Sequence, residues 1–258
     1  MILDEIANYA KIRVQDDKKV RNLDEMKRQA IESKKGDFCF EKALNKSDIQ
    51  TICEVKKASP SKGIIAEEFD HIQVALEYEA AGATCISVLT EPKYFLGKDN
   101  YLSEIRRVVN IPLLRKDFII DEYQIYQAKV MGADCILLIC ALLSLEQIKN
   151  YLSICDELGL SVLVETHDEE EIKRAVLAGA RMIGVNNRNL KTFEVDIHNS
   201  EKLRKFVPKD IIFIAESGIH SNKEIQILRK AGVNAVLIGE SLMKSRDKKA
   251  ALEELLKL

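Results

Sequence analysis

Two residues of opposite charge lie close together early in the chain, at the end of an apolar segment. Glu54 and Lys56 are two positions apart within residues 51–56, and a turn rich in Pro, Ser and Gly follows. Side chains alternate between the faces of a β-strand, so both would point the same way. A carboxylate beside an ammonium can supply a base and an acid to one site. A single pair of this kind is more often an exposed ion pair, so its interpretation depends on the rest of the chain.

Polar residues follow several other apolar segments in the same way. They are Lys116, Glu165, Asn186, Arg188, Glu216 and Ser217. Charged groups placed there gain nothing for folding, because a buried charge is destabilising unless it is paired. In a parallel barrel the carboxyl ends of the strands meet at one face, where barrel enzymes have their active sites. Two lysines and three glutamates arriving at that face predict a catalytic cluster.

A repeat in the sequence predicts the elements that would bring these residues together. Small residues flank a glycine about every 50 residues, at Gly82, Gly132, Gly179 and Gly232. Each glycine is typical of a helix end and precedes a β-branched segment, at 85–89, 135–139, 182–186 and 235–239. Further strand-like segments interleave with these, at 51–56, 111–116, 161–165 and 211–216.

Eight strands alternating with helices predict an α/β fold, a closed parallel (β/α)8 TIM barrel. A doubly wound open sheet is the alternative, but the G-x-G-x-x-G fingerprint typical of many such sheets does not occur in the sequence. Residues 1–46 contain no convincing strand. There we expect two amphipathic helices ending near Gly36, the second with Asn22 as N-cap. The prediction is one domain over residues 1–258, with 1–46 as a helical extension that covers one end of the barrel or contributes to the pocket.

Composition narrows the class of partner. The formal net charge is −2 and charged residues make up 31% of the chain, so no basic excess suggests nucleic acid. The longest apolar run is too short to cross a membrane and no signal peptide is evident, so we expect a cytoplasmic protein, and a monomer. The six cysteines form no C-x-x-C pair and are expected to be reduced core residues. The four histidines lack metal-ligand spacing and are expected at the surface or at helix ends.

The last two predicted strands carry a different signature. Ser217-Gly218 and Gly239-Glu240-Ser241 form small turns after them. Barrels often bind a phosphate at this place, where glycine lets backbone N–H groups approach the anion and serine adds a hydroxyl donor. A small phosphorylated substrate is therefore the expected partner. A side chain at Gly218 or Gly239 would be expected to enter the space of the anion.

Taken together, the motifs resemble those of the indole-3-glycerol phosphate synthase family over nearly the whole chain. The motifs are Glu54-x-Lys56-x-x-Ser59-Pro60-Ser61, Lys116-Asp117-Phe118, Val164-Glu165, Asn186-Asn187-Arg188-Asn189-Leu190, Ala215-Glu216-Ser217-Gly218-Ile219 and Gly239-Glu240-Ser241. The resemblance implies a barrel enzyme of tryptophan biosynthesis. Such an enzyme closes 1-(2-carboxyphenylamino)-1-deoxyribulose 5-phosphate into indole-3-glycerol phosphate and releases carbon dioxide and water, without a cofactor or metal.

The resemblance also implies roles for single residues. Lys116 would be the general acid and Glu165 the general base, while Glu54, Lys56 and Asn186 orient the substrate. Further residues would act beside them: Ser217 and Arg188 alongside these groups, Glu216 in binding the substrate, Ser59, Gly218, Gly239 and Ser241 on the phosphate, and Phe95, Phe118 and Leu190 against the aromatic ring. A lysine suits the acid role once neighbouring charge and partial burial bring its pKa toward the working pH.

One departure from the family pattern and two rival functions remain open. Some relatives carry a basic residue where this chain has Ala58, so backbone dipoles or Lys62 would have to meet the phosphate charge here. A lysine Schiff-base aldolase is a different chemistry on the same fold, with Lys116 or Lys56 as the nucleophile. A non-catalytic sensor of phosphate ligands would leave the ring of charges unexplained.

Overall fold

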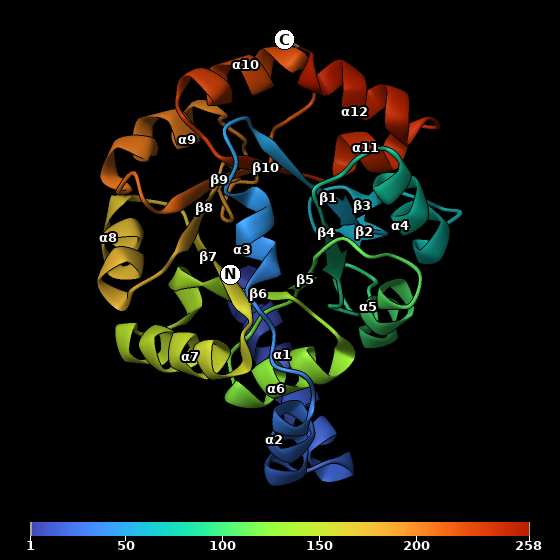
Figure 1. The fold of residues 1–258 in the computed structure, drawn as a ribbon, viewed down its shortest axis with the longest axis vertical. Helices are drawn as coiled ribbons and strands as arrows, with labels where there is room; N and C mark the ends of the chain where they lie inside the picture. Colours follow the sequence, from blue (N-terminus) through green and yellow to red (C-terminus); the bar gives the residue numbers. More distant parts are fainter. Residues whose placement is uncertain (1, 258) are drawn as a thin grey trace.

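The computed structural model describes residues 2–257, and its centre is a closed barrel of parallel strands (Figure 1). Going around the barrel, the strands follow the order β1-β10-β9-β8-β7-β6-β5-β4, and β4 pairs with β1 to close the ring. Helices alternate with the strands and surround them. The predicted (β/α)8 barrel is therefore confirmed.

The barrel strands lie within two residues of the predicted segments. They are β1 (Gln50–Val55), β4 (Cys85–Leu89), β5 (Leu113–Lys116), β6 (Cys135–Ile139), β7 (Ser161–Thr166), β8 (Met182–Asn186), β9 (Ile212–Glu216) and β10 (Ala235–Ile238). Lys56, expected as the last residue of the first strand, follows directly after β1. A short hairpin of β2 (Ala58–Ser59) and β3 (Gly63–Ile64) stands outside the barrel; the sequence analysis read this stretch only as a turn.

Several of the outer helices begin or end at capping residues. They are α4 (His71–Ala80), α5 (Asp99–Arg106), α6 (Glu122–Met131), α7 (Leu145–Leu158), α8 (Glu169–Ala178), α9 (His198–Leu203), α10 (Asn222–Lys230), α11 (Glu240–Lys244) and α12 (Lys248–Leu256), with single 3₁₀ turns η1 (Cys140–Leu142) and η2 (Arg204–Phe206). Gly132 and Gly179 have φ of 90° and 92°, a conformation that closes a helix at little cost only for glycine. Ser144 and Gln147 form a full capping box at the start of α7.

Three helices precede the barrel, one more than expected. They are α1 (Ile2–Val20), α2 (Leu23–Glu32), for which Asn22 is the N-cap, and α3 (Cys39–Leu44). Helix α3 was not predicted, because its six residues contain too few turns to display a helical period. Phe40 and Leu44 of α3 are fully buried and plug the amino end of the barrel, so α3 lies at its centre in Figure 1.

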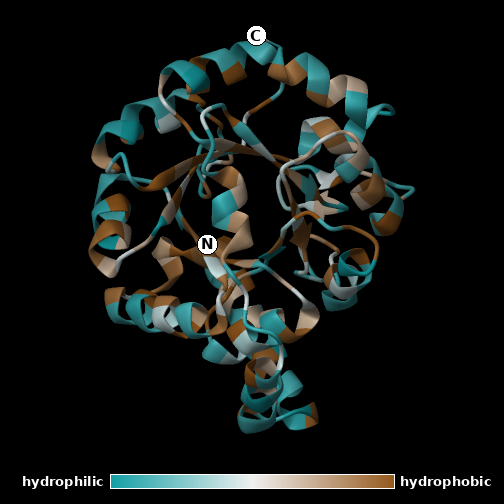
Figure 2. Cartoon of the chain, viewed as in Figure 1, coloured by the Kyte–Doolittle hydropathy of each residue, from teal (hydrophilic) through white to brown (hydrophobic). Residues whose placement is uncertain are grey.

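The core has two layers, which follow from the alternation of side chains along each strand. Inward-facing residues such as Ile52, Leu114 and Leu163 pack with α3 in the barrel interior. Outward-facing residues such as Val55 and Val164 pack against the surrounding helices, whose apolar sides face the barrel while their outer sides are hydrophilic (Figure 2). Within residues 2–257 no helix combines the length and apolar character that crossing a bilayer requires.

Candidate active site

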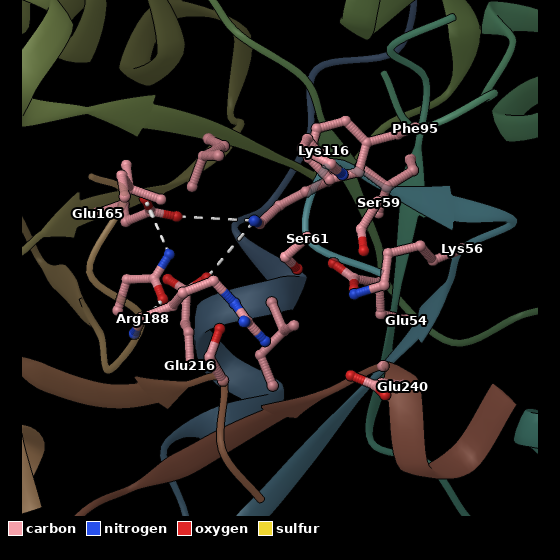
Figure 3. A pocket seen from close by; sticks show the side chains of 18 of the residues that line it. Glu54, Lys56, Ser59, Ser61, Phe95, Lys116, Glu165, Arg188, Glu216 and Glu240 are labelled. Carbon is pink, nitrogen blue, oxygen red and sulfur yellow. Dashed lines mark hydrogen bonds and ion pairs between the residues drawn. The ribbon is translucent and has the colours of Figure 1, made fainter. Parts of the chain in front are cut away.

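All the residues that the sequence analysis assigned to the site line one cavity at the carboxyl ends of the strands. We call this cavity the reaction chamber. Lys116 is central to it: Nζ lies 3.6 Å from Oε2 of Glu165 and 3.5 Å from Oε2 of Glu216 (Figure 3). These side chains are almost entirely buried, with 15%, 4% and 2% of their surface exposed, respectively. The strands β5, β7 and β9 therefore bring one ammonium and two carboxylates into direct contact.

Glu54 and Lys56 form the ion pair that strand alternation predicted. Their side chains lie on the other side of the chamber from Glu165 in Figure 3. Gly239, at the end of β10, comes so close to this pair that a Cβ atom there would lie 2.8 Å from Nζ of Lys56 and closer still to Oε2 of Glu54. The expectation for Gly239 was different, because a side chain was predicted to meet the phosphate. The structure places the Glu54–Lys56 pair in that direction.

The charges in the chamber shift one another's pKa. Burial alone would lower the pKa of Lys116, but the charges of Glu216, Glu165 and Glu54 outweigh burial and raise it above its usual range. The sequence predicted a pKa lowered toward the working pH. The observed direction is the opposite, because carboxylates from three other strands, β9, β7 and β1, act on Lys116. Burial, with the charge of Glu165, raises the pKa of Glu216 to about 8. The chamber therefore holds a lysine whose pKa is raised beside a carboxyl group whose raised pKa favours its protonated form.

Backbone and amide groups fix the remaining polar residues. Asn186 donates from Nδ2 to Oε1 of Glu165 at 3.3 Å and accepts from the backbone N–H of Arg188 at 3.0 Å. Asn187, which is buried, donates to the carbonyl of Ser217 at 3.1 Å. Ser217 has a φ of 68°, a left-handed conformation that is uncommon for serine. The loops after β8 and β9 are thus tied together beside the general-base candidate.

The candidate phosphate contacts lie in the same cavity, on the loops after β1, β9 and β10. Ser59, Gly218, Gly239 and Ser241 line it. Ser241 donates from Oγ to the carbonyl of Ile219 at 3.0 Å. Lys62 in the β2–β3 hairpin lies 3.9 Å from Glu240, so its ammonium faces this end of the chamber.

Apolar residues form another part of the wall. The rings of Phe95 and Phe118 are 6.0 Å apart, and Leu190 lines the same cavity. Phe95 is held by the loop after β4, in which the buried carboxylate of Glu91 accepts the backbone N–H groups of Lys93, Tyr94 and Phe95 at 2.7–3.0 Å. Three residues of α1, Ile2, Leu3 and Ile6, complete the wall. The helical extension therefore contributes to the pocket, which was one of its two expected roles.

Comparison with known proteins gives this arrangement a family. The sequence profile of the family described as indole-3-glycerol phosphate synthase matches residues 3–255. The chain is 57% identical over 256 residues to the indole-3-glycerol phosphate synthase of Ruminiclostridium cellulolyticum, covering 99% of this chain and 98% of that one. It is also 57% identical to the enzyme of the same name from Endomicrobium trichonymphae, with 99% of both chains covered. The chain belongs to the indole-3-glycerol phosphate synthase family.

Members of this family are carboxy-lyases of tryptophan biosynthesis. A more distant likeness concerns the fold alone. The crystal structure of KGPDC from Streptococcus mutans superimposes with a TM-score of 0.63 at 12% identity, covering 81% of this chain and 96% of that chain. The two chains thus share the barrel fold.

Two features of the site were not predicted from the sequence. The first is Asp117, next to Lys116, whose buried carboxylate accepts from both Nη atoms of Arg13 at 2.6 and 3.2 Å and from Thr90 at 2.7 Å. Burial would raise the pKa of Asp117, but the charges of Arg13 and Arg115 lower it below its usual value. Arg13 belongs to α1, so this bridge fastens the helical extension to the strand end that carries Lys116.

The second missed feature is His167, which was expected at the surface or at a helix end. Its Nε2 atom is buried and lies 3.5 Å from Oε1 of Glu165. His167 is two residues beyond Glu165, so the alternation that paired Glu54 with Lys56 could have found it. His220 is exposed and directly precedes the N-cap of α10, as expected, and it also lines the reaction chamber. Within residues 2–257 no group of three or more His, Cys, Asp or Glu side chains is arranged to hold a metal ion.

Proposed function

We propose that the chamber converts 1-(2-carboxyphenylamino)-1-deoxyribulose 5-phosphate into indole-3-glycerol phosphate with Lys116 as general acid and Glu165 as general base. The observation that carries these roles is the position of Lys116 Nζ, 3.6 and 3.5 Å from carboxylates on two other strands. An ammonium held in this way has a proton ready to donate and a base within reach. Opposed acid and base groups in a confined site are what this reaction requires.

Ring closure comes first. The aromatic carbon that bears the carboxylate attacks the ketone carbon of the substrate, and Lys116 protonates the ketone oxygen to give a hydroxyl group. The raised pKa of Lys116 keeps its proton in place until negative charge develops on that oxygen. Lys56, paired with Glu54, stays charged and orients the substrate carboxylate.

Decarboxylation and dehydration follow. The closed ring carries positive charge that involves its nitrogen, and loss of carbon dioxide restores the neutral aromatic ring. The hydroxyl group then leaves as water with a second proton, which the carboxyl group of Glu216 supplies, and Glu165 removes one proton from the adjacent carbon to complete the indole. Asn186 donates to Glu165 and so orients this carboxylate. Ser217, Arg188 and Glu216 act beside them.

The rest of the substrate would be held by the two ends of the chamber. Ser59, Gly218, Gly239 and Ser241 bind the phosphate, aided by the ammonium of Lys62 in place of a basic residue at Ala58. The apolar wall of Phe95, Phe118 and Leu190 packs on the aromatic ring. We further propose that residues 1–258 act as one domain, in a monomeric cytoplasmic enzyme.

One assay tests the reaction. Purified protein is mixed with the carboxyphenylamino substrate in the presence of a chelator, and indole-3-glycerol phosphate is followed by its fluorescence. Product formation that persists with chelator supports the proposal, whereas strict dependence on a metal would overturn the mechanism. Glu165→Gln removes the basicity but keeps the shape, so turnover should fall by about 10²–10⁴-fold while product binding changes little. Near wild-type turnover would transfer the base role to another carboxylate, with Glu54 the first candidate.

The aldolase chemistry is tested separately. A Schiff base between Lys116 or Lys56 and a keto-phosphate would be trapped irreversibly by borohydride. The proposed mechanism predicts no such covalent adduct, which mass spectrometry of the treated protein would detect.

A further inference from the structure

The proposed reaction leaves the chamber short of one proton after each turnover. Two protons are delivered to the ketone oxygen, which departs as water, and one proton is taken from carbon by Glu165. The substrate carboxylate leaves as carbon dioxide without bringing a proton of its own. One proton must therefore enter from solvent before the next cycle, although Glu165 is only 4% exposed and Lys116 only 15%.

A second cavity lies behind the wall that carries Glu165. We call it the outer cavity; it is lined by His167, Asp168, Glu171, Arg174, Asn199 and the loop after β8. Glu165 lines the reaction chamber but not the outer cavity, whereas His167 and Glu171 line the outer cavity but not the chamber. His167 thus stands between the two, with Nε2 buried in the wall, 3.5 Å from Glu165 Oε1, and Nδ1 3.2 Å from Glu171 Oε2.

We propose that His167, supported by Glu171, is the route by which a proton from solvent water in the outer cavity passes through Glu165 and Lys116 to reload Glu216. This proposal rests on the roles assigned to Lys116 and Glu165 above. Glu165 first returns the proton taken from carbon to the deprotonated amine, 3.6 Å away. Glu216, which supplied the second proton, is then reloaded: His167 gives its Nε2 proton to the Glu165 carboxylate, which passes it through Lys116 to Glu216, 3.5 Å from Lys116 Nζ. Glu165 is again a carboxylate, and water in the outer cavity restores the imidazolium. Over one cycle a single proton enters, which is the number that the reaction consumes.

The surroundings of His167 favour the charged imidazolium that such a route needs. Burial would lower the pKa of His167, but the hydrogen bond to Glu171 and the charges of Glu165, Glu171 and Glu216 raise it above its usual value. Nδ1 is hydrogen-bonded to Glu171, and Nε2 lies 3.5 Å from the Glu165 carboxylate without a hydrogen-bond partner among residues 2–257, so both ring nitrogens can carry a proton. Glu171 is itself fixed, because it also accepts the backbone N–H of His167 at 2.8 Å.

The order of events separates this route from a structural role. A resting enzyme is fully loaded, so the first turnover needs no proton from His167, whereas every later one does. We therefore expect His167→Ala to show a burst of about one product per enzyme at nearly the wild-type rate, followed by steady-state turnover reduced by about tenfold or more. Imidazole added to the buffer should restore the steady state by entering the outer cavity. Rapid-mixing fluorescence measures both phases.

Two further variants complete the test. His198→Ala removes a histidine that forms a similar pair with Glu201 at 2.8 Å but is half exposed and lies outside both cavities, so it should behave as wild type with and without imidazole. Glu171→Gln leaves His167 in place. It should also show a normal first turnover, followed by a steady-state rate that falls less than in His167→Ala. This variant keeps the proposal testable if His167→Ala does not fold.

The outcomes are distinct. Equal loss of the first turnover and of the steady state in His167→Ala or Glu171→Gln, or no loss in either, overturns the route. An active Glu165→Gln would instead overturn the assignment of the base. An inactive Glu165→Gln together with wild-type behaviour of both His167→Ala and Glu171→Gln would leave the proposed function standing and reject the route alone.

Discussion

Replacing Gly239 with alanine should impair turnover, although the residue was predicted only as a phosphate contact. Its φ is −118°, so alanine meets no left-handed strain there. The new Cβ would lie 2.8 Å from Nζ of Lys56, whereas ordinary contacts begin at 3.4 Å. To reach ordinary contact, Lys56 must then move by about 0.6 Å, the difference of those two distances, and Glu54 must move further.

A shift of this size is large for a site that orients a substrate. Since misplacement by about 1 Å can cost about 10²-fold in rate, we expect kcat of Gly239→Ala to fall by about 10-fold to 10²-fold. Steady-state fluorescence assays over a range of substrate concentrations separate kcat from KM. A raised KM with unchanged kcat would refute this reasoning, because it would mean that the new methyl group meets only the phosphate.

A second glycine provides the matched control. Gly232 has a φ of 75° and no atom within 4 Å of an added Cβ. Gly232→Ala should therefore lower the free energy of unfolding by about 1 kcal/mol through backbone strain while leaving kcat unchanged. A fall in kcat in this control would point to a general loss of folded protein instead of a local collision.

Three further predictions concern charged residues. Lys116→Met should abolish ring closure, by about 10²–10⁴-fold in kcat, while substrate still binds; Lys56→Met should be milder, and the reverse order in the same assay would exchange their roles. Arg13→Met leaves the buried Asp117 without its main partner, so urea unfolding should show a loss of about 3 kcal/mol, with a higher KM as α1 loosens. Because the folded-state pKa of Asp117 is lowered, its stabilising effect is present above its unfolded pKa and disappears as the pH falls through the folded value; the difference between wild type and Arg13→Met should shrink over that interval, and a constant difference would contradict it.

The parts of this molecule that the sequence predicts are those governed by local spacing. Strand ends were located because apolar segments stop at a polar residue and because glycines such as Gly132 must close a helix. The rim residues followed from the strands, since parallel strands in a barrel end at one face. The pairing of Glu54 with Lys56 needed only the two-residue period of a strand.

Contacts between segments far apart in the chain leave no such pattern in the sequence. The bridge from Arg13 to Asp117 joins residues 104 positions apart, and nothing local to either one indicates the other. The pKa of Lys116 was expected in the wrong direction for a related reason. Its nearest carboxylates come from β7 and β9, and the number of them that reach one ammonium depends on the register of the barrel.

The end of β5 carries both the proposed proton donor and the residue that anchors α1, which forms part of the chamber wall. Lys116 enters the reaction chamber, while its neighbour Asp117 binds Arg13 of α1. The same helix contributes Ile2, Leu3 and Ile6 to the chamber wall. A displacement of α1 would therefore act on the wall and on the residue next to the proposed acid together, because both depend on one buried ion pair. Adjacent residues in the sequence thus couple the closure of the chamber to the position of the proton donor.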